Sequence, residues 1–143
     1  MINVKETLAS KTYFVNNEYL DMYARLVERN TRTPVLHGVT NKHHILPKSW
    51  FKMNKLPVDN SLSNLVNLVY REHVLAHYYL CLCTVAELQY ANQLALICLL
   101  SRKKLNSVDK QLVTTLPLYK NIYESYIKNR QNGMQLYKED IDW

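Results

Sequence analysis

The chain has 143 residues, of which 48% are hydrophobic and 21% are charged, and its formal net charge is +6. These values exclude a disordered chain, and the length fits one globular domain with a buried core, with little room for a second. The longest apolar run, residues 94–101, is shorter than the roughly 18 residues that cross a bilayer. We therefore expect one domain, spanning residues 1–143, with no membrane partner.

The N-terminus, "MINVKETLAS", lacks the apolar segment of a secretory signal peptide, which predicts a cytoplasmic protein. The three cysteines are Cys81, Cys83 and Cys98. Their odd number and their spacing do not fit a disulfide framework, so we interpret them as reduced and mostly buried thiols.

One stretch in the first half of the chain carries positive charge only. From Arg29 to Val58 there are six lysines and arginines and no acidic residue. This run has two interpretations, a solvated basic surface or a surface that neutralises phosphates. Charge alone does not choose between them.

The first predicted element is an amphipathic helix over residues 17–30, where apolar residues recur at intervals of three and four. Asn16 or Asn17 can cap its start. Pro34 and Gly38 then interrupt the helical pattern.

A β-hairpin is predicted next. Residues 39–46 have β-branched residues at both ends and no helical stripe, which favours a short strand that ends at Pro47. Residues 47–63 are polar and are expected to be irregular, with turn residues near their end. Residues 65–70, "LVNLVY", predict the second strand.

Helical periodicity resumes at Arg71 and continues to about Cys83, and Thr84 is a candidate cap for the following helix, which ends in "RKK". Another helix is predicted to start at Ser107. A last helix is predicted over 118–130, and the Asn132-Gly133 pair that follows it is a typical stop.

Four of the five histidines fall in two short stretches. His73 and His77 are four residues apart on a predicted helix, so they share a face and can reach one ion, although such a pair alone is weak support for a metal site. His43 and His44 are neighbours on a predicted strand, so their side chains point to opposite faces and only one of them can join that ion. His37 is interpreted as incidental.

Three pieces of sequence occur in a characteristic order: His43-His44-Ile45, then Asn64-Leu65-Val66, then Arg71-Glu72-His73 with Ala76-His77. In this order and spacing they resemble the HNH family of nucleases, in particular the phage-encoded enzymes of the homing type. The resemblance covers about residues 15–130. It implies an α+β, mainly α fold in which a ββα-metal (His-Me) finger, about residues 39–83, is embedded between flanking helices at 17–30 and 85–130.

The resemblance also implies roles for individual residues. His44 would be the general base that activates water, and Asn64 would tie down the loop between the strands. His43 and His73 would ligate the metal, and His77 aligns with a third ligand of the colicin-like members. The implied cofactor is one divalent ion: the family often uses magnesium or manganese, whereas imidazole ligands favour zinc, manganese or nickel over magnesium.

Two departures from the family pattern stand out. Asn41 occupies the place where many relatives carry a glutamate, two residues before the histidine pair. The segment "SWFKMNKLPVDNS" replaces a Gly-Gly turn, and we expect its Trp50 and Phe51 to pack on the core rather than meet DNA.

The expected activity is metal-dependent hydrolysis of DNA phosphodiesters, leaving 5′-phosphate and 3′-hydroxyl ends, in the host cytoplasm if the protein is phage-encoded. The alternative is a non-catalytic DNA-binding protein whose finger is a metal-stapled scaffold, which would have no use for His44. The partner is double-stranded DNA, and a homodimer would place a second site on the other strand. The residues expected to face DNA are Lys42, Lys48, Lys52 and Arg71, although the lysines also fit a solvated loop and Arg71 fits an ion pair with Glu72 or Asp59.

Overall fold

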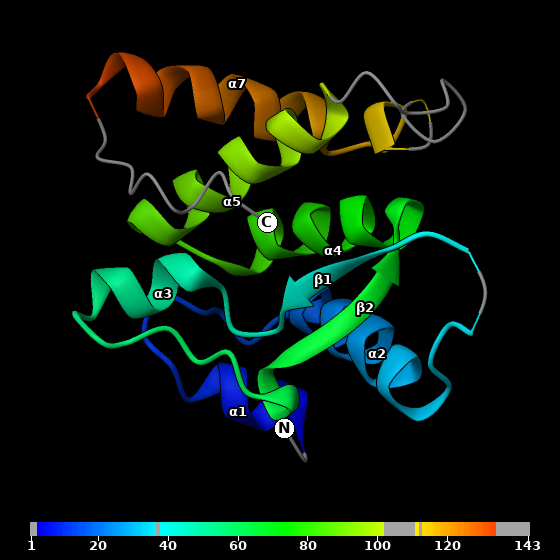
Figure 1. The fold of residues 1–143 in the computed structure, drawn as a ribbon. Coiled ribbons are helices and arrows are strands. Elements are labelled where there is room, and N and C mark those ends of the chain that lie inside the picture. Colours follow the sequence, from blue (N-terminus) through cyan, green and yellow to red (C-terminus); the bar gives the residue numbers. More distant parts are fainter. Residues whose placement is uncertain (1–2, 37, 102–110, 112, 134–143) are drawn as a thin grey trace.

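The computed structural model describes residues 3–36, 38–101, 111 and 113–133. It is mainly helical with one small antiparallel sheet, as the sequence predicts for an α+β fold (Figure 1). In chain order the elements are α1 (Val4–Ala9), α2 (Glu18–Arg32), β1 (Thr40–His44), α3 (Lys48–Met53), a 3₁₀ turn (Leu62–Asn64), β2 (Leu65–Val69), α4 (Tyr70–Cys83), α5 (Ala86–Leu100) and α7 (Tyr119–Gln131).

Helix α4 runs through the middle of the molecule, with α5 and α7 on one side and the hairpin and α2 on the other (Figure 1). It is apolar around most of its circumference and contributes to two hydrophobic clusters. Ala76 and Leu80 pack with residues of α1, α2, α3 and the hairpin, whereas Val74 and Tyr78 pack with α5 and α7. A helix that is buried on two sides is a rigid support for the side chains that it carries toward the hairpin.

Strands β1 and β2 pair antiparallel, with His43 opposite Val66 and His44 opposite Leu65. Because side chains alternate across a strand, this register buries His43 and leaves its neighbour His44 partly exposed. The hairpin therefore presents the two histidines to different environments, as the sequence predicts.

Residues 48–53 form the helix α3, so the expectation that 47–63 would be irregular is wrong for this part. Pro47 precedes the helix in an extended conformation that suits a helix start. Trp50 and Phe51 are each only 8% exposed, and the Trp50 indole donates to the carbonyl of Thr12. Burial of these two aromatic rings on the core, as predicted, offsets the polar character of the segment.

Several helix ends can be compared with their predictions. Asn17 caps α2, since its side-chain oxygen accepts from the amides of Tyr19 and Leu20. Thr84 does not cap α5: its hydroxyl donates back to the Leu80 carbonyl and so closes α4. Because the Thr84 hydroxyl bonds within the preceding helix, it is not available to α5, which begins after Val85.

Other predictions concern the N-terminal segment and the C-terminal third of the chain. Helix α1, capped by Asn3, has no counterpart among the predicted elements. The predicted helix start at Ser107 lies outside the described residues. Helix α7 ends at Gln131, and Gly133 follows with a φ of +71°, a conformation that glycine adopts without strain. Within the described ranges, no helix is both long and apolar enough to cross a membrane.

Candidate metal centre and its surroundings

Three buried histidines converge between the hairpin and the central helix. His43 comes from β1, and His73 and His77 lie one turn apart on α4. One ring nitrogen of each lies within 4.8 Å of the others, so the three are close enough to bind one metal ion. The rings are 3%, 0% and 6% exposed, respectively. The structure thus brings together the three residues that the sequence analysis assigned as ligands.

Burial keeps two of these imidazoles neutral. It lowers the pKa of His77 to about 4, with a smaller and opposite effect from the side chain of Asn92. The pKa of His43 is also held well below its ordinary value, first by burial and then by the neighbouring His77, His73 and His44. A neutral imidazole has the free lone pair that metal ligation requires, so neutral pH favours this cluster as a metal site.

Tyr23 sets the orientation of His43 from outside the hairpin. This fully buried residue of α2 donates its hydroxyl proton to the carbonyl of Ile45, at 2.7 Å. Its oxygen lies 2.7 Å from Nε2 of His43 and, with its own proton used, must accept from that nitrogen. His43 therefore carries its proton on Nε2 and keeps the lone pair of Nδ1 for a metal.

Asn41 sets the orientation of His73 in a similar way. Its amide oxygen lies 3.1 Å from Nδ1 of His73, and an amide oxygen only accepts, so the proton is on Nδ1 and the lone pair on Nε2. Asn41 and His43 are two residues apart on β1, so both side chains point to the same face of the strand.

The residues of the cluster fit a divalent ion. Neither ring nitrogen of the buried His77 makes a hydrogen bond within the described residues, and the side-chain nitrogen of the neighbouring Asn92 donates to the Leu88 carbonyl instead. A metal ion would give one of these ring nitrogens a partner. Two nitrogens on one tetrahedral zinc lie about 3.4 Å apart, given bonds of about 2.1 Å.

His44 lies on the other side of the strand. Its Nε2 is 2.8 Å from the side-chain oxygen of Asn60, in an exposed position. Asp59 is near enough to interact with it: hydrogen bonds from Ser61 lower the pKa of Asp59 most, and the charge of His44 lowers it further. A polar, solvent-accessible imidazole beside a carboxylate is a suitable proton acceptor and donor.

Asn64 is buried and ties the loop between the strands to the hairpin. Its side-chain oxygen accepts from the amide of Leu46 at 2.9 Å, and its side-chain nitrogen donates to the carbonyls of Leu46 and Asp59 at 3.3 and 2.9 Å. Its backbone carbonyl accepts from the amide of Ile45. The chain just after His44 and the chain beside Asn60 are thus held by one side chain.

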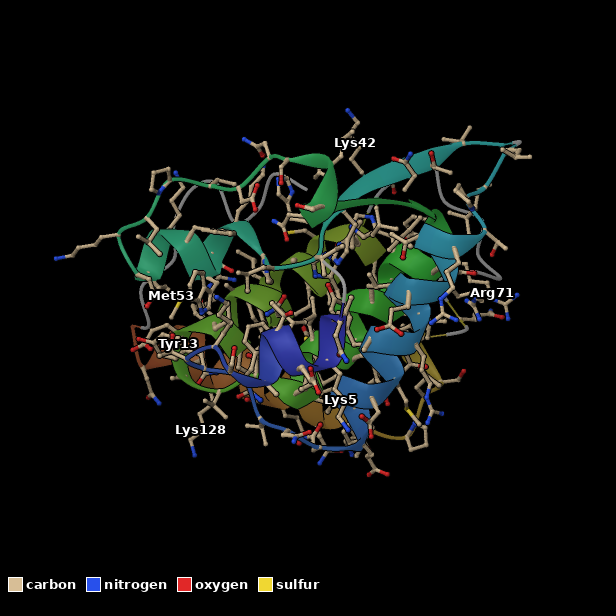
Figure 2. The ribbon with its side chains drawn as sticks, turned by 90° about the horizontal axis from the view of Figure 1, so that it is seen from below. Lys5, Tyr13, Lys42, Met53, Arg71 and Lys128 are labelled. Atoms are coloured by element: carbon tan, nitrogen blue, oxygen red, sulfur yellow. The ribbon has the colours of Figure 1, made fainter. Side chains whose placement is uncertain are left out.

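Two of the four residues that we expect to face DNA, Lys42 and Arg71, project in different directions (Figure 2). Lys42 is exposed and shares a strand face with His44, whereas Arg71 is exposed at the start of α4 and projects in a different direction (Figure 2). Lys48 and Lys52 are partly buried on α3. The carboxylate of Glu72, one of the two expected partners of Arg71, forms an ion pair with Arg29 at 3.0 Å.

Sequence reasoning missed the roles of Tyr23 and Asn60. Tyr23 looks like any other apolar-face residue of the helix at 17–30, and Asn60 like a turn residue. The position of Asn41 offered a signal, because residues two apart on a strand share a face and a side chain at 41 must therefore accompany His43.

The comparisons with known proteins add no relatives: no family model, no curated protein and no solved structure matches this chain. Its function is therefore inferred from the residues of the site and from their geometry.

Proposed function

We propose that the protein is a metal-dependent DNA endonuclease of the HNH type, in which β1, β2 and α4 form the ββα-metal finger. One observation carries the proposal: adjacent histidines on β1 diverge, with His43 entering a buried cluster beside His73 and His77 while His44 reaches a polar, accessible position. The arrangement supports two separate roles, metal ligation by the buried cluster and general-base catalysis by His44.

In the proposed reaction, His44 takes a proton from a water molecule as that water attacks the phosphorus of a DNA phosphodiester. The bond from phosphorus to the 3′-oxygen breaks, and the departing oxygen takes a proton from solvent water, leaving 5′-phosphate and 3′-hydroxyl ends. Asn64 keeps the loop after β1 in register with the hairpin, so the effect of this residue on the reaction is geometric.

His43, His73 and His77 would hold the divalent ion through Nδ1 of the first, Nε2 of the second and one nitrogen of the third. When bound, the ion supplies Lewis-acid stabilisation of charge on the scissile phosphate and the 3′-oxygen. Magnesium or manganese would serve catalysis in the family that the chain resembles, while three imidazoles suit zinc or nickel.

Lys42 shares a strand face with His44 and would contact a phosphate near the scissile bond. Lys48 and Lys52 would add further phosphate contacts to double-stranded DNA, and Arg71, which projects in a different direction from Lys42 (Figure 2), would reach only a more remote part of the duplex. Such contacts position a protein on DNA without reading its sequence. A monomer would nick one strand, and a homodimer would cut both.

The test is cleavage of supercoiled plasmid with Mg²⁺, Mn²⁺, Zn²⁺ or Ni²⁺ by wild type and by His44→Ala, both checked for folding by circular dichroism. Cleavage by wild type and its loss in the variant are expected, and nicked or linear product reports the mode of cutting. Equal cleavage by both proteins would exclude His44 as the base. Folded wild type that binds DNA but never cuts it would favour the metal-stapled scaffold.

A further inference from the structure

Asn60 offers His44 a hydrogen-bond acceptor. Its side-chain oxygen lies 2.8 Å from Nε2 of His44. An amide oxygen accepts and does not donate, so this contact requires the proton of the neutral ring to be on Nε2. Nδ1 is then the nitrogen with the free lone pair, the only one that can receive a proton.

We propose that Asn60 is the positioning residue of His44, selecting the Nε2–H tautomer and the ring orientation in which Nδ1 faces the attacking water. This inference rests on the proposed function, because it assigns Asn60 a task in the same reaction. A partly exposed imidazole without such an acceptor would exchange between two tautomers, and the Nδ1–H form cannot take a proton at Nδ1.

The backbone around Asn60 is held on both sides. The carbonyl of Asp59 accepts from the side chain of Asn64, and the carboxylate of Asp59 accepts from the amide of Ser61 at 2.9 Å. The carbonyl of Ser61 in turn accepts from the amide of Asn64 at 2.9 Å. Asn60 therefore sits in a turn that is anchored to the end of β1, the strand that carries His44.

Asn64 therefore affects the position of His44 in two ways. Asn64 fixes Leu46, two residues after His44, and also fixes Asp59, next to Asn60. One buried amide thus sets the distance between the imidazole and its acceptor. Because Asn60 itself is exposed and contributes little to the core, replacing it should leave the fold intact.

The test uses the full chain labelled with ¹⁵N-histidine, at about pH 8, where an ordinary histidine is neutral. Long-range ¹H–¹⁵N spectra report which nitrogen of His44 carries the proton. Asn60→Leu keeps the approximate shape but removes the acceptor, and Asn60→Asp keeps an oxygen in its place. Asn67→Leu, at an exposed asparagine of β2, is the matched control.

We expect the Nε2–H tautomer in wild type, in Asn60→Asp and in Asn67→Leu, and a mixture in Asn60→Leu. The kcat for plasmid cleavage should fall roughly 10- to 100-fold in Asn60→Leu, with KM little changed, and should largely recover in Asn60→Asp. An Nδ1–H tautomer in wild type would overturn the inference, as would unchanged tautomer and rate in Asn60→Leu.

The two readouts separate the inference from the proposed function. A wild type that shows the Nε2–H tautomer but cuts no DNA would overturn the nuclease and its reaction, while the hydrogen bond would stand. A wild type that cuts DNA while Asn60→Leu retains both tautomer and rate would overturn the positioning role alone.

Discussion

The hydroxyl of Tyr23 lies 2.7 Å from Nε2 of His43 and joins helix α2 to a strand 20 residues further along the chain. The same hydroxyl donates to the carbonyl of Ile45, two residues beyond the histidine. One buried phenol therefore orients a candidate metal ligand and the strand that carries it. The candidate site thus depends on α2 as well as on the hairpin and α4.

Tyr23→Phe should weaken metal binding, because His43 would lose the partner that holds its proton on Nε2. Partners of this kind contribute about 10- to 100-fold to metal affinity. The variant should also lose about 1–3 kcal/mol of unfolding free energy, since the Ile45 carbonyl and the His43 ring nitrogen lose a buried partner. Calorimetric titration with Zn²⁺ and urea denaturation measure the two effects. Tyr123→Phe, at a 46% exposed tyrosine, is the control, and equal losses in both variants would contradict the role of Tyr23.

Asn41 provides a test of the second ligand. Asn41→Asp would place a carboxylate against Nδ1–H of His73, which raises the basicity of the ring and should tighten metal binding. Asn41→Ala should weaken metal binding because the ring is no longer oriented. Titration of both variants with Zn²⁺ beside wild type gives the order of affinities. If the Asp variant binds no more tightly than the Ala variant, the contact does not tune the ligand.

Metal should stabilise the fold by binding the histidine cluster, and His44 on the other face of β1 should not contribute to this effect. At a free metal concentration of about 100 times Kd, the free energy of unfolding should rise by about 2.7 kcal/mol. This increment should vanish in His73→Gln, which removes a ligand, and persist in His44→Ala, whose side chain points away from the cluster. Urea denaturation with Zn²⁺ and with chelator measures it. An increment of the same size in His73→Gln would place the ion elsewhere.

The metal-free protein should lose stability in mild acid. The pKa of His77 is about 4 in the folded chain and near 6.5 in an unfolded one, so between these values the unfolded state binds more protons. The unfolding free energy should therefore fall as pH drops from about 6.5 to about 4, by roughly 3 kcal/mol from His77. His43, whose pKa is also lowered by burial, acts in the same direction.

Urea denaturation in chelator at a series of pH values tests this dependence, with His77→Gln as the comparison. In the variant, the unfolding free energy should fall less steeply with decreasing pH. The slope should correspond to the uptake of up to one proton fewer on unfolding. A flat profile for wild type through mild acid would contradict the burial of neutral histidines in the cluster.

Lys42 and Lys128 offer a matched pair for DNA binding. Lys42 shares a strand face with His44, whereas Lys128 on α7 projects from the opposite side of the molecule (Figure 2). Lys42→Ala should weaken binding to DNA of any sequence and reduce the salt dependence of log K by about one unit. Fluorescence anisotropy at several salt concentrations measures both. Equal effects of the two substitutions would indicate diffuse attraction rather than a defined DNA-binding face.

Local patterns predicted the helices and strands near the site well. The intervals between apolar residues indicated α2, α4, α5 and α7, and the alternation along β1 already separated His43 from His44. Helix α3 could not be predicted from its polar pattern, because its stability comes from burying Trp50 and Phe51 against residues far away in the chain.

Residue spacing alone indicates which side chains share a face: His73 and His77 do so on a helix, whereas His43 and His44 point in opposite directions from a strand. That these faces meet is a result of tertiary packing, because the hairpin and α2 pack against α4 and so set the distances among three imidazoles. The packing also sets which nitrogen of each oriented ring carries the proton. That choice depends on single hydrogen bonds that the rings donate to Tyr23, Asn41 and Asn60, and these bonds depend on positions in space that residue spacing does not encode.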